Sequence, residues 1–256
     1  MIHQTAIIDT SARIADDVEI GPYSIVGADV EIGSGTVIGP HVVVSGPCKI
    51  GCDNRIFQFA SVGEMPQDKK YQGEPSWLLI GDRNVIREYV TLHRGTDCGI
   101  GKTVIGSDNL FMACSHVAHD CVVGDHTVFA NAASLSGHVE VGDHAVLGGF
   151  TSVHQYIQIG SQAFCGLGSV VTQDIPPYSS AAGNRARAIG INKEGLKRKG
   201  FSADLIQVLH KVFRALLKSK GPRQDTFANL QPLCDKYPEV EEFVSFVKNS
   251  KRGIAS

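Results

Sequence analysis

Apolar residues recur every six positions along the first two thirds of the chain. Stepping by six from Ile2 reaches isoleucine or valine at every step to Val62, and the count resumes at Ile80. From Ile105 it continues to Val171 in a phase shifted by one residue. The residue two before each of these positions is mostly small or β-branched as well. This spacing is neither helical nor that of a hairpin strand, and it is typical of hexapeptide repeats in a parallel β-helix.

The repeats predict the fold class and the domain organisation. Three hexads close one triangular coil of about 18 residues. We therefore expect a mainly β protein in which residues 1–173 form a left-handed parallel β-helix. The count is interrupted at 64–79 and 94–104, where glycine, proline and charged residues gather. These segments are predicted to be loops that leave the prism, either as functional excursions or as tolerated insertions.

A different pattern begins at residue 174. Asp174-Ile175-Pro176-Pro177 is expected to end the β-helix, because adjacent prolines cannot donate to a strand ladder. Ser202 is a candidate N-cap for a helix with apolar residues at helical spacing, which Gly221-Pro222 would stop. Two shorter amphipathic segments follow. The chain from 174 to 256 is therefore predicted to form a linker and a C-terminal α-helical domain.

Charge and cysteine content narrow the class of protein. The chain carries 24 Lys+Arg against 26 Asp+Glu, a formal net charge of −2, which disfavours nucleic acid as a main partner. No apolar run is long enough for a membrane span and the N-terminus lacks a signal pattern, so a cytoplasmic location is expected. Seven cysteines without a Cys-x-x-Cys spacing predict neither a disulfide framework nor a zinc knuckle.

Six of the ten histidines lie between positions 116 and 154. With a coil of about 18 residues, positions 119 and 120 fall beside 137 and 138 one coil later and beside 155 on the next. His119 comes two residues after an inward position, so it should face outward. A carboxylate at Asp120 can fix the imidazole tautomer and stabilise its protonated form, which suits a general base. The polar line predicted along this edge consists of His119, Asp120, Gly137, His138, His154 and Gln155.

The histidines allow two other interpretations. They can be ordinary surface residues that stack, since His126 and His144 are also 18 residues apart. Alternatively, His116-x-x-His119 and the stacked histidines could bind zinc, because imidazole is a common zinc ligand.

Other catalytic motifs are missing from the sequence. It contains no phosphate-binding Gly-Lys-Ser/Thr loop, no dinucleotide-binding glycine fingerprint and no Gly-x-Ser-x-Gly elbow. A basic cluster precedes the predicted helices, and it is either a solvated face or a site for a phosphorylated ligand or an acidic protein. Its members are Arg185, Arg187, Lys193, Lys197, Arg198 and Lys199.

From end to end the chain resembles the UDP-N-acetylglucosamine O-acyltransferases that open lipid A synthesis. The motifs that carry the resemblance are Ile56-Phe57-Gln58-Phe59-Ala60-Ser61-Val62-Gly63-Glu64, Asp68-x-Lys70-Tyr71-x-Gly73-Glu74-Pro75, Ile80-Gly81-Asp82-Arg83-Asn84, His93-Arg94-Gly95-Thr96, Ala118-His119-Asp120, Val153-His154-Gln155 and Glu194-Gly195-Leu196-Lys197-Arg198. Together they are far more specific than the hexads alone, because many acetyltransferases and some carbonic anhydrases share the hexad fold.

The resemblance implies an activity and its partners. Members of this family move an (R)-3-hydroxyacyl chain from acyl carrier protein to the glucosamine 3-hydroxyl of UDP-N-acetylglucosamine. They work as homotrimers with active sites between subunits, and no separate cofactor is implied because the acyl donor arrives on the phosphopantetheine of the carrier protein. The basic cluster would then meet an acidic carrier protein.

The resemblance also implies residue roles. His119 would be the general base, Asp120 would orient it, and the backbone N–H of Gly137 would stabilise the oxyanion. Asp68 and Lys70 would hold the sugar and its neighbours, and Asn192, Glu194 and Arg198 would contact the nucleotide. The residues implied to position acceptor and acyl donor are His116, His138, His154 and Gln155. No metal is implied.

Two positions depart from the family pattern. Lys199 stands where a second arginine is frequent, which keeps the charge but loses bidentate phosphate geometry. Leu167 occupies the place of the family's acyl-length ruler, where glycine admits a long chain. A chain of about ten to twelve carbons is therefore expected, because a branched side chain cannot be compressed in a packed groove.

Other functions on the same scaffold stay open from sequence. They are an acetyl-coenzyme A-dependent acetyltransferase, a zinc enzyme of the carbonic anhydrase kind and a non-catalytic scaffold. The loop at 68–75 and the helical C-terminus speak against the first, and the histidine-rich edge speaks against the last.

Overall fold

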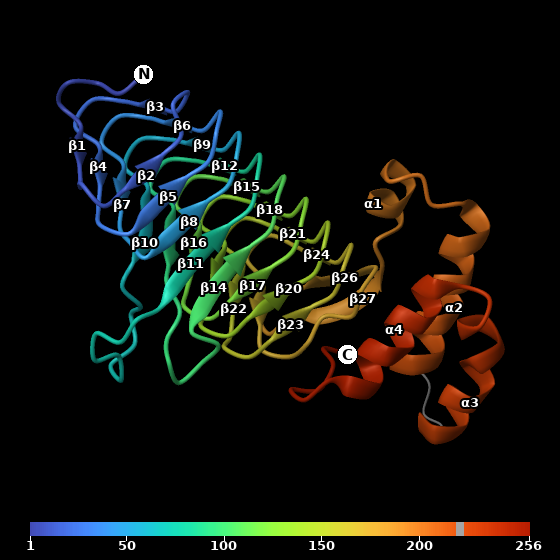
Figure 1. Ribbon diagram of the computed structural model, residues 1–256. Helices are drawn as coiled ribbons and strands as arrows, with labels where there is room; N and C mark the ends of the chain where they lie inside the picture. Colours follow the sequence, from blue (N-terminus) through green and yellow to red (C-terminus); the bar gives the residue numbers. More distant parts are fainter. Residues whose placement is uncertain (219–222) are drawn as a thin grey trace.

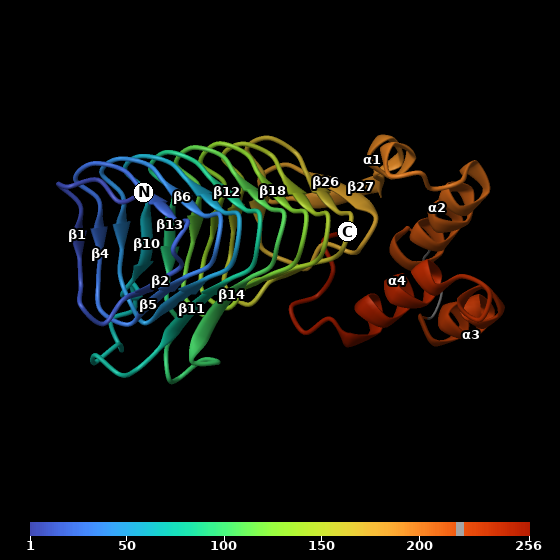
Figure 2. The ribbon, with the colours of Figure 1, turned by 45° about the horizontal axis from the view of Figure 1, so that its top comes forward.

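Short strands wind into a three-sided prism that ends in a group of helices (Figure 1). The computed structural model describes residues 1–218 and 223–256. Within them, three sheets form the walls of the prism, and every strand except the last pairs in parallel with a strand one coil away (Figure 2). The prediction of a mainly β, left-handed parallel β-helix with a helical C-terminal region is confirmed.

The three sheets take their strands in turn along the chain. Sheet I contains β1 (Ile7–Ile8), β4 (Ile25–Val26), β7 (Val43–Val44), β10 (Ser61–Glu64), β13 (Thr91–His93), β16 (His116–Val117), β19 (Ser134–Leu135), β22 (Ser152–Val153) and β25 (Val170–Val171). Sheet II contains β2 (Arg13–Ile14), β5 (Val30–Ile32), β8 (Cys48–Ile50), β11 (Trp77–Ile80), β14 (Lys102–Ile105), β17 (Val122–Val123), β20 (Glu140–Val141) and β23 (Gln158–Ile159). Sheet III contains β3 (Glu19–Ile20), β6 (Val37–Ile38), β9 (Arg55–Ile56), β12 (Val85–Ile86), β15 (Leu110–Phe111), β18 (Val128–Phe129), β21 (Val146–Leu147), β24 (Phe164–Cys165), β26 (Ser179–Ala182) and β27 (Arg187–Ile191).

The sheets meet at three edges, which we number by the walls that they join. The first edge lies between sheets I and II, the second between sheets II and III, and the third between sheets III and I. The repeat positions of the hexads are buried inside the prism, from Ile20 and Val26 to Val171. Burial of these aliphatic side chains between successive coils supplies the main stabilisation, since a single coil has no core of its own.

The two loops are shorter than the sequence predicted. Strand partners are 18 residues apart in the regular coils, as for Val128 and Val146, but Ser61 pairs with Thr91 and Leu78 with Thr103. The expected loops 64–79 and 94–104 therefore narrow to 65–76 and 94–101. The difference arises because β11 and β14 are four residues long and pair over their full length, so their first residues belong to sheet II.

The paired prolines do not end the parallel sheets. Ile175 still forms a bridge to Ile159, and β26 pairs in parallel with β24. The prediction of an end at 174–177 was wrong, because Pro176 and Pro177 lie between these pairings, where the ladder needs no donor from them. Strand β27 then adds to β26 in the antiparallel sense and leads into the helices.

The C-terminal helices are α1 (Lys193–Arg198), α2 (Ala203–Leu217), α3 (Arg223–Cys234) and α4 (Pro238–Asn249). The predicted cap of the longest is confirmed, since the Ser202 hydroxyl accepts a hydrogen bond from the Leu205 N–H at 3.2 Å. The predicted stop at Gly221-Pro222 lies outside the described residues. The tail returns to the prism, where the Ala255 N–H donates to the Asp174 carbonyl at 3.0 Å. In the described ranges, every helix is too short or too polar to cross a bilayer.

Candidate active site

The predicted polar line occupies the first edge of the prism. Equivalent positions follow one another at intervals of one coil, because the His138 N–H donates to the His119 carbonyl at 3.0 Å and the Tyr156 N–H donates to the Gly137 carbonyl at 3.2 Å. Each corner needs one residue in the left-handed region, with φ of 60° at Asp120, 62° at His138 and 64° at Tyr156. Aspartate and histidine tolerate this conformation better than most residues do.

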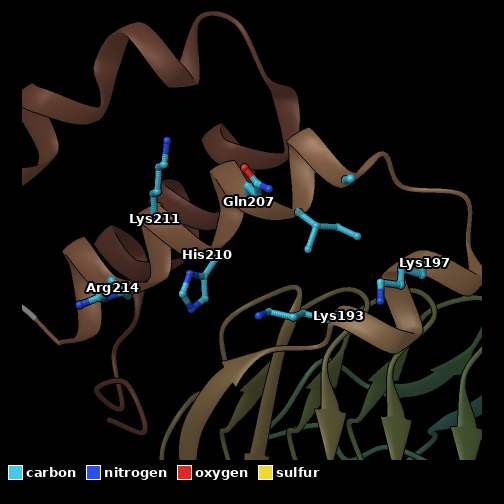
Figure 3. Close-up of a pocket in the computed structure, with 8 residues that line it drawn as sticks. Lys193, Lys197, Gln207, His210, Lys211 and Arg214 are labelled. Atoms are coloured by element: carbon cyan, nitrogen blue, oxygen red, sulfur yellow. The ribbon is translucent and has the colours of Figure 1, made fainter.

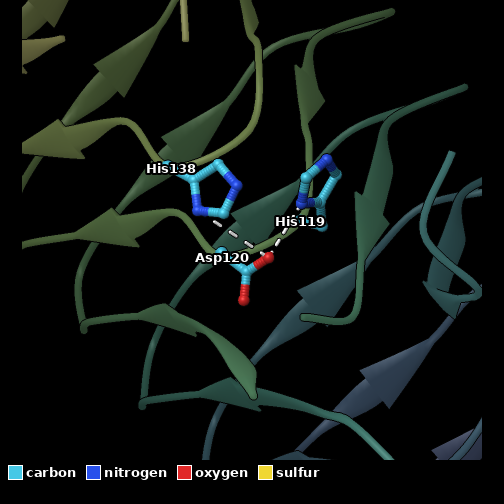
Figure 4. A group of neighbouring side chains, drawn as sticks. All are labelled: His119, Asp120 and His138. Atoms are coloured by element: carbon cyan, nitrogen blue, oxygen red, sulfur yellow. Dashed lines mark hydrogen bonds and ion pairs between the residues drawn. The ribbon is translucent and has the colours of Figure 1, made fainter. Parts of the chain in front are cut away.

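His119 and Asp120 form a hydrogen-bonded pair on this edge (Figure 4). His119 Nδ1 lies 2.8 Å from Asp120 Oδ2. The imidazole is 13% exposed, whereas the carboxylate is fully buried. A buried carboxylate beside Nδ1 favours the tautomer with its proton there, which leaves Nε2 as an acceptor for a substrate proton.

Residues of the loop 94–101 hold the Asp120 carboxylate. The Thr96 hydroxyl donates to Oδ2 at 2.6 Å, and the backbone N–H groups of Thr96 and Ile100 each donate to Oδ1 at 3.0 Å. Burial opposes ionisation, but the hydrogen bonds from His119, Thr96 and Ile100 outweigh it and lower the pKa of Asp120. Sequence reasoning had not assigned a role to Thr96 or Ile100, although Thr96 stands in one of the quoted motifs.

Glycine is required where this loop passes the carboxylate. A Cβ at Gly99 would lie 2.3 Å from the nearest atoms of the Asp120 carboxylate, well inside contact distance. The loop can therefore approach closely only without a side chain at this position.

His119, Asp120 and His138 have the spacing of a metal site, with one ligand atom of each within 4.8 Å of the others. Both oxygens of Asp120, however, already accept two hydrogen bonds each. A metal ion would have to displace donors from a satisfied carboxylate. His116, the other residue of the zinc interpretation, has its Nδ1 2.7 Å from the Thr91 hydroxyl. The hydrogen bonding thus favours a catalytic pair over zinc.

His138 extends the pair by one coil. Its ring meets His119 edge-on at a centroid distance of 5.0 Å and stacks on Tyr156 at 4.4 Å. Burial lowers the pKa of His138, although Asp120, with Oδ2 3.9 Å from Nδ1, partly offsets this effect. The imidazole is therefore kept neutral near pH 7. Tyr156 was not a candidate from sequence, but it forms the platform for this ring.

His116 and His93 lie on the neighbouring strands β16 and β13 of sheet I. Their rings meet edge-on at 5.0 Å. Burial lowers the pKa of His116 to about 4, and burial also lowers the pKa of His93, against a raising effect of Glu64. In the described residues the Nδ1 of His93 has no hydrogen-bond partner. His93 was not a candidate from sequence. The loop 94–101 lies between His93 and the next coil, so a spacing of 18 residues does not bring His93 beside His116.

Gly137 packs directly against the ring of His119. A Cβ at this position would lie 2.6 Å from Cε1 and 2.7 Å from Nε2 of the imidazole. Within residues 1–218 and 223–256, the backbone N–H of Gly137 has no protein acceptor. An unpaired N–H on a residue that packs against the imidazole is suited to a negatively charged oxygen formed next to the base.

The remaining candidates for the first edge are Asp68, Lys70, His154 and Gln155. Asp68, whose Oδ1 accepts the Lys70 N–H at 3.0 Å, is close enough for its charge to act on the pKa of His138. His154 and Gln155 are exposed one coil beyond Gly137. His154 Nδ1 lies 3.3 Å from a guanidinium nitrogen of Arg252, which the returning tail brings to this edge and which sequence reasoning missed.

Asn192, Glu194 and Arg198 do not lie on the first edge. The Asn192 side chain donates to the Gln162 carbonyl at 3.0 Å and accepts from the Gly195 N–H at 3.2 Å, so it caps α1 over the second edge. Glu194 pairs with Lys197 at 3.1 Å. Asn192, Glu194 and Arg198 line a groove of about 550 Å³ beside Phe164.

Leu167 lies on the third edge and is 76% exposed. Leu167 comes before a strand of sheet I, namely β25. The first edge, which carries His119, comes after the strands of sheet I. Leu167 and the His119–Asp120 pair therefore border opposite margins of one wall.

The fold and site define a transferase of the hexapeptide-repeat class. Residues 2–46 match the family model described as bacterial transferase hexapeptide (six repeats). Residues 174–255 match a second model, described as UDP N-acetylglucosamine O-acyltransferase, domain 2.

Relatives narrow this class to one family. The chain is 51% identical over 253 residues to the acyl-[acyl-carrier-protein]--UDP-N-acetylglucosamine O-acyltransferase of Saccharophagus degradans, covering 99% of this chain and 98% of the relative. It superposes on LpxA from Acinetobacter baumannii with a TM-score of 0.97 and 47% identity, over 100% of this chain and 99% of the other. The Arabidopsis UDP-N-acetylglucosamine acyltransferase gives a TM-score of 0.89 at 34% identity, with both chains fully covered. The chain belongs to the UDP-N-acetylglucosamine O-acyltransferase family.

Proposed function

We propose that this chain transfers an (R)-3-hydroxyacyl group from acyl carrier protein to the glucosamine 3-hydroxyl of UDP-N-acetylglucosamine, the first step of lipid A synthesis. The observation that carries the proposal is the His119–Asp120 pair, with Nδ1 2.8 Å from a buried carboxylate oxygen and Gly137 packed against the imidazole ring. The reaction would take place in the cytoplasm.

His119 and Gly137 suffice for direct transfer. Nε2 of His119 takes the proton of the 3-hydroxyl as its oxygen attacks the thioester carbonyl carbon. The carbonyl oxygen becomes negative and accepts a hydrogen bond from the Gly137 N–H. The C–S bond then breaks, and the departing thiolate recovers the proton from His119. Asp120 stays ionised and stabilises the imidazolium between these steps. The thioester is already activated, so no enzyme nucleophile or further cofactor is needed.

The neighbouring neutral residues suit binding rather than proton transfer. His116 and His138 have lowered pKa values because of burial, so each can donate a hydrogen bond without adding charge. In this proposal His116, His138, His154 and Gln155 position acceptor and donor. Asp68 and Lys70 reach the sugar from the loop 65–76.

The separation of the two candidate surfaces supports a site shared between chains. The catalytic pair is on the first edge, whereas Asn192, Glu194 and Arg198 are over the second. A wall about six residues wide places roughly 20 Å between these edges. One nucleotide sugar can contact both sets if the second comes from a neighbouring subunit, as in a homotrimer. Lys199 would add charge near the diphosphate.

A comparison of acyl donors tests the proposed function. With UDP-N-acetylglucosamine as acceptor, the chain is expected to turn over (R)-3-hydroxyacyl carrier protein and not acetyl-coenzyme A, because its full-length relative is named for acyl transfer from acyl carrier protein. The product is resolved by mass. Acetyl transfer without hydroxyacyl transfer would overturn the proposal in favour of a coenzyme A-dependent enzyme. Activity that is lost on chelation and restored by zinc would overturn the direct mechanism.

The substitution Leu167→Gly is expected to lengthen the preferred acyl chain. The native enzyme should prefer about ten to twelve carbons, since an exposed leucine at the margin of the wall blocks further extension. Turnover of ten- to fourteen-carbon donors by native and variant chains checks this. Ile189→Gly, which removes a similarly exposed side chain from β27, is the matched control and should leave the preference unchanged. A fourteen-carbon preference in the native chain would contradict the assignment of Leu167.

A further inference from the structure

The C-terminal tail is held on the prism through one buried residue, Asp174. Its backbone N–H donates to the Gly253 carbonyl at 2.8 Å, and its backbone carbonyl accepts from the Ala255 N–H at 3.0 Å. Its carboxylate accepts from the Ser250 hydroxyl at 2.6 Å and from the Gln158 N–H at 2.9 Å. These contacts fix the path of the tail beside the prism.

The path of the tail places one cation on the first edge. Arg252 is exposed, and its Nη2 lies 3.3 Å from His154 Nδ1. It also lines a cavity of about 170 Å³ together with His138 and Tyr156. Other cations of the C-terminal region gather in a groove between α1 and α2 instead (Figure 3). Arg252 is therefore in direct contact with a candidate residue of the first edge.

The contact decides which nitrogen of His154 carries the proton. A guanidinium has only N–H donors, so Nδ1 must accept and the proton of the neutral ring is on Nε2. Nδ1 also lies 3.3 Å from the Gln155 carbonyl oxygen, a contact that would need the proton on Nδ1 instead. The two contacts exclude each other. A hydrogen bond from a charged donor is roughly twice as strong as one between neutral groups, so Arg252 selects the form with the proton on Nε2.

His154 is in this respect the reverse of His119. Asp120 keeps the proton of His119 on Nδ1, which leaves Nε2 to accept a proton. Arg252 keeps the Nδ1 of His154 unprotonated, which leaves the Nε2–H to donate a hydrogen bond. Within the described residues, the Nε2 of His154 has no protein partner. The first edge therefore carries one imidazole set to accept a proton and another set to hold an oxygen atom.

We infer that Arg252 is a positioning residue that fixes His154 as a hydrogen-bond donor to a hydroxyl or carbonyl oxygen of a substrate. The C-terminal tail is then part of the site, because Asp174 holds the segment that carries Arg252. This inference rests on the proposed acyl transfer and deepens it, since it gives the returning tail a role in substrate binding.

The tautomer of His154 can be measured by nitrogen NMR of a chain with isotope-labelled histidines, at about pH 8.5, where an ordinary imidazole is neutral. Its signals are those missing from His154→Gln. The native chain should have the proton on Nε2. In Arg252→Ala it should move to Nδ1, where the Gln155 carbonyl accepts it, and Arg252→Lys should keep the native form, because an ammonium also donates without accepting. A proton on Nδ1 in the native chain would overturn the inference.

Kinetics test whether this tautomer matters for the reaction. Arg252→Ala is expected to lower kcat/KM about tenfold, the size of one hydrogen bond to a substrate, and Arg252→Lys should recover most of the loss. In a chain that already carries His154→Ala, Arg252→Ala should cause no further loss, because Arg252 acts through His154. The thermal midpoint should not change, since Asp174 still anchors the tail.

The matched control is Lys251→Ala, which removes the neighbouring exposed cation of the same tail. It should leave both the tautomer and kcat/KM unchanged. An equal loss in the control, a further loss from Arg252→Ala in the His154→Ala chain, or native kcat/KM in Arg252→Ala would each overturn the role of Arg252. If the native chain turned over neither hydroxyacyl carrier protein nor acetyl-coenzyme A, the proposed function itself would fail. The tautomer measurement needs no substrate, so the two failures are distinct.

Discussion

His119→Ala is expected to lower kcat/KM by a factor of about 10³ to 10⁴, at the upper end of what a general base contributes. The substitution removes the acceptor at Nε2 and leaves no other titratable group in its place. His138 is a poorer base than His119. Its Nδ1 lies 3.9 Å from Asp120 Oδ2, too far for the hydrogen bond that would stabilise its protonated form, and burial lowers its pKa. Steady-state kinetics with hydroxyacyl carrier protein measure the effect.

The variant should remain folded. Asp120 keeps its hydrogen bonds from Thr96 and Ile100, so the carboxylate is not left unpaired. The matched control is His126→Ala on the second edge, whose ring is 49% exposed and stacks on His144. It should keep native turnover. Turnover of His119→Ala comparable to that of the control would remove His119 as the base.

Gly137→Ala is expected to reduce kcat by about two orders of magnitude without a large loss of stability. The new Cβ would lie 2.6 Å from Cε1 of His119, so the ring must move. A displacement of about 1 Å at a catalytic group can cost a factor of 10². The backbone of Gly137 is outside the left-handed region, so alanine itself is tolerated there. Measurements of kcat and of the thermal midpoint separate the two effects.

Gly190→Ala is the control for this substitution, because a Cβ there meets no atom within 4 Å. It should be silent in both assays. If Gly137→Ala kept native kcat, the close packing of Gly137 on the imidazole would have no catalytic meaning.

The periodic part of the molecule was predictable because each hexad repeats the same local rule. An apolar residue every six positions determines which side chains point inward, and the 18-residue coil then brings His119 next to Gly137 and His138. The pairing of His119 with Asp120 follows from adjacency at a corner. This part of the site could therefore be inferred without coordinates.

The non-periodic parts could not be predicted in the same way. Thr96 and Ile100 reach Asp120 from a loop whose path no repeat specifies. Arg252 comes to His154 because the tail docks on Asp174, a contact between residues far apart in the sequence. The separation of Asn192 from His119 could not be predicted either, because Asn192 follows the antiparallel strand β27, which lies outside the hexads.

A crystal soaked with UDP-N-acetylglucosamine tests the central claim most directly, namely that the first edge carries the chemistry and a neighbouring chain carries the nucleotide. We expect the glucosamine 3-hydroxyl oxygen within hydrogen-bond distance of His119 Nε2, about 2.6–3.2 Å. We also expect the diphosphate on α1 of a second copy. A sugar bound with its 3-hydroxyl away from His119, or with both surfaces supplied by one chain, would contradict it.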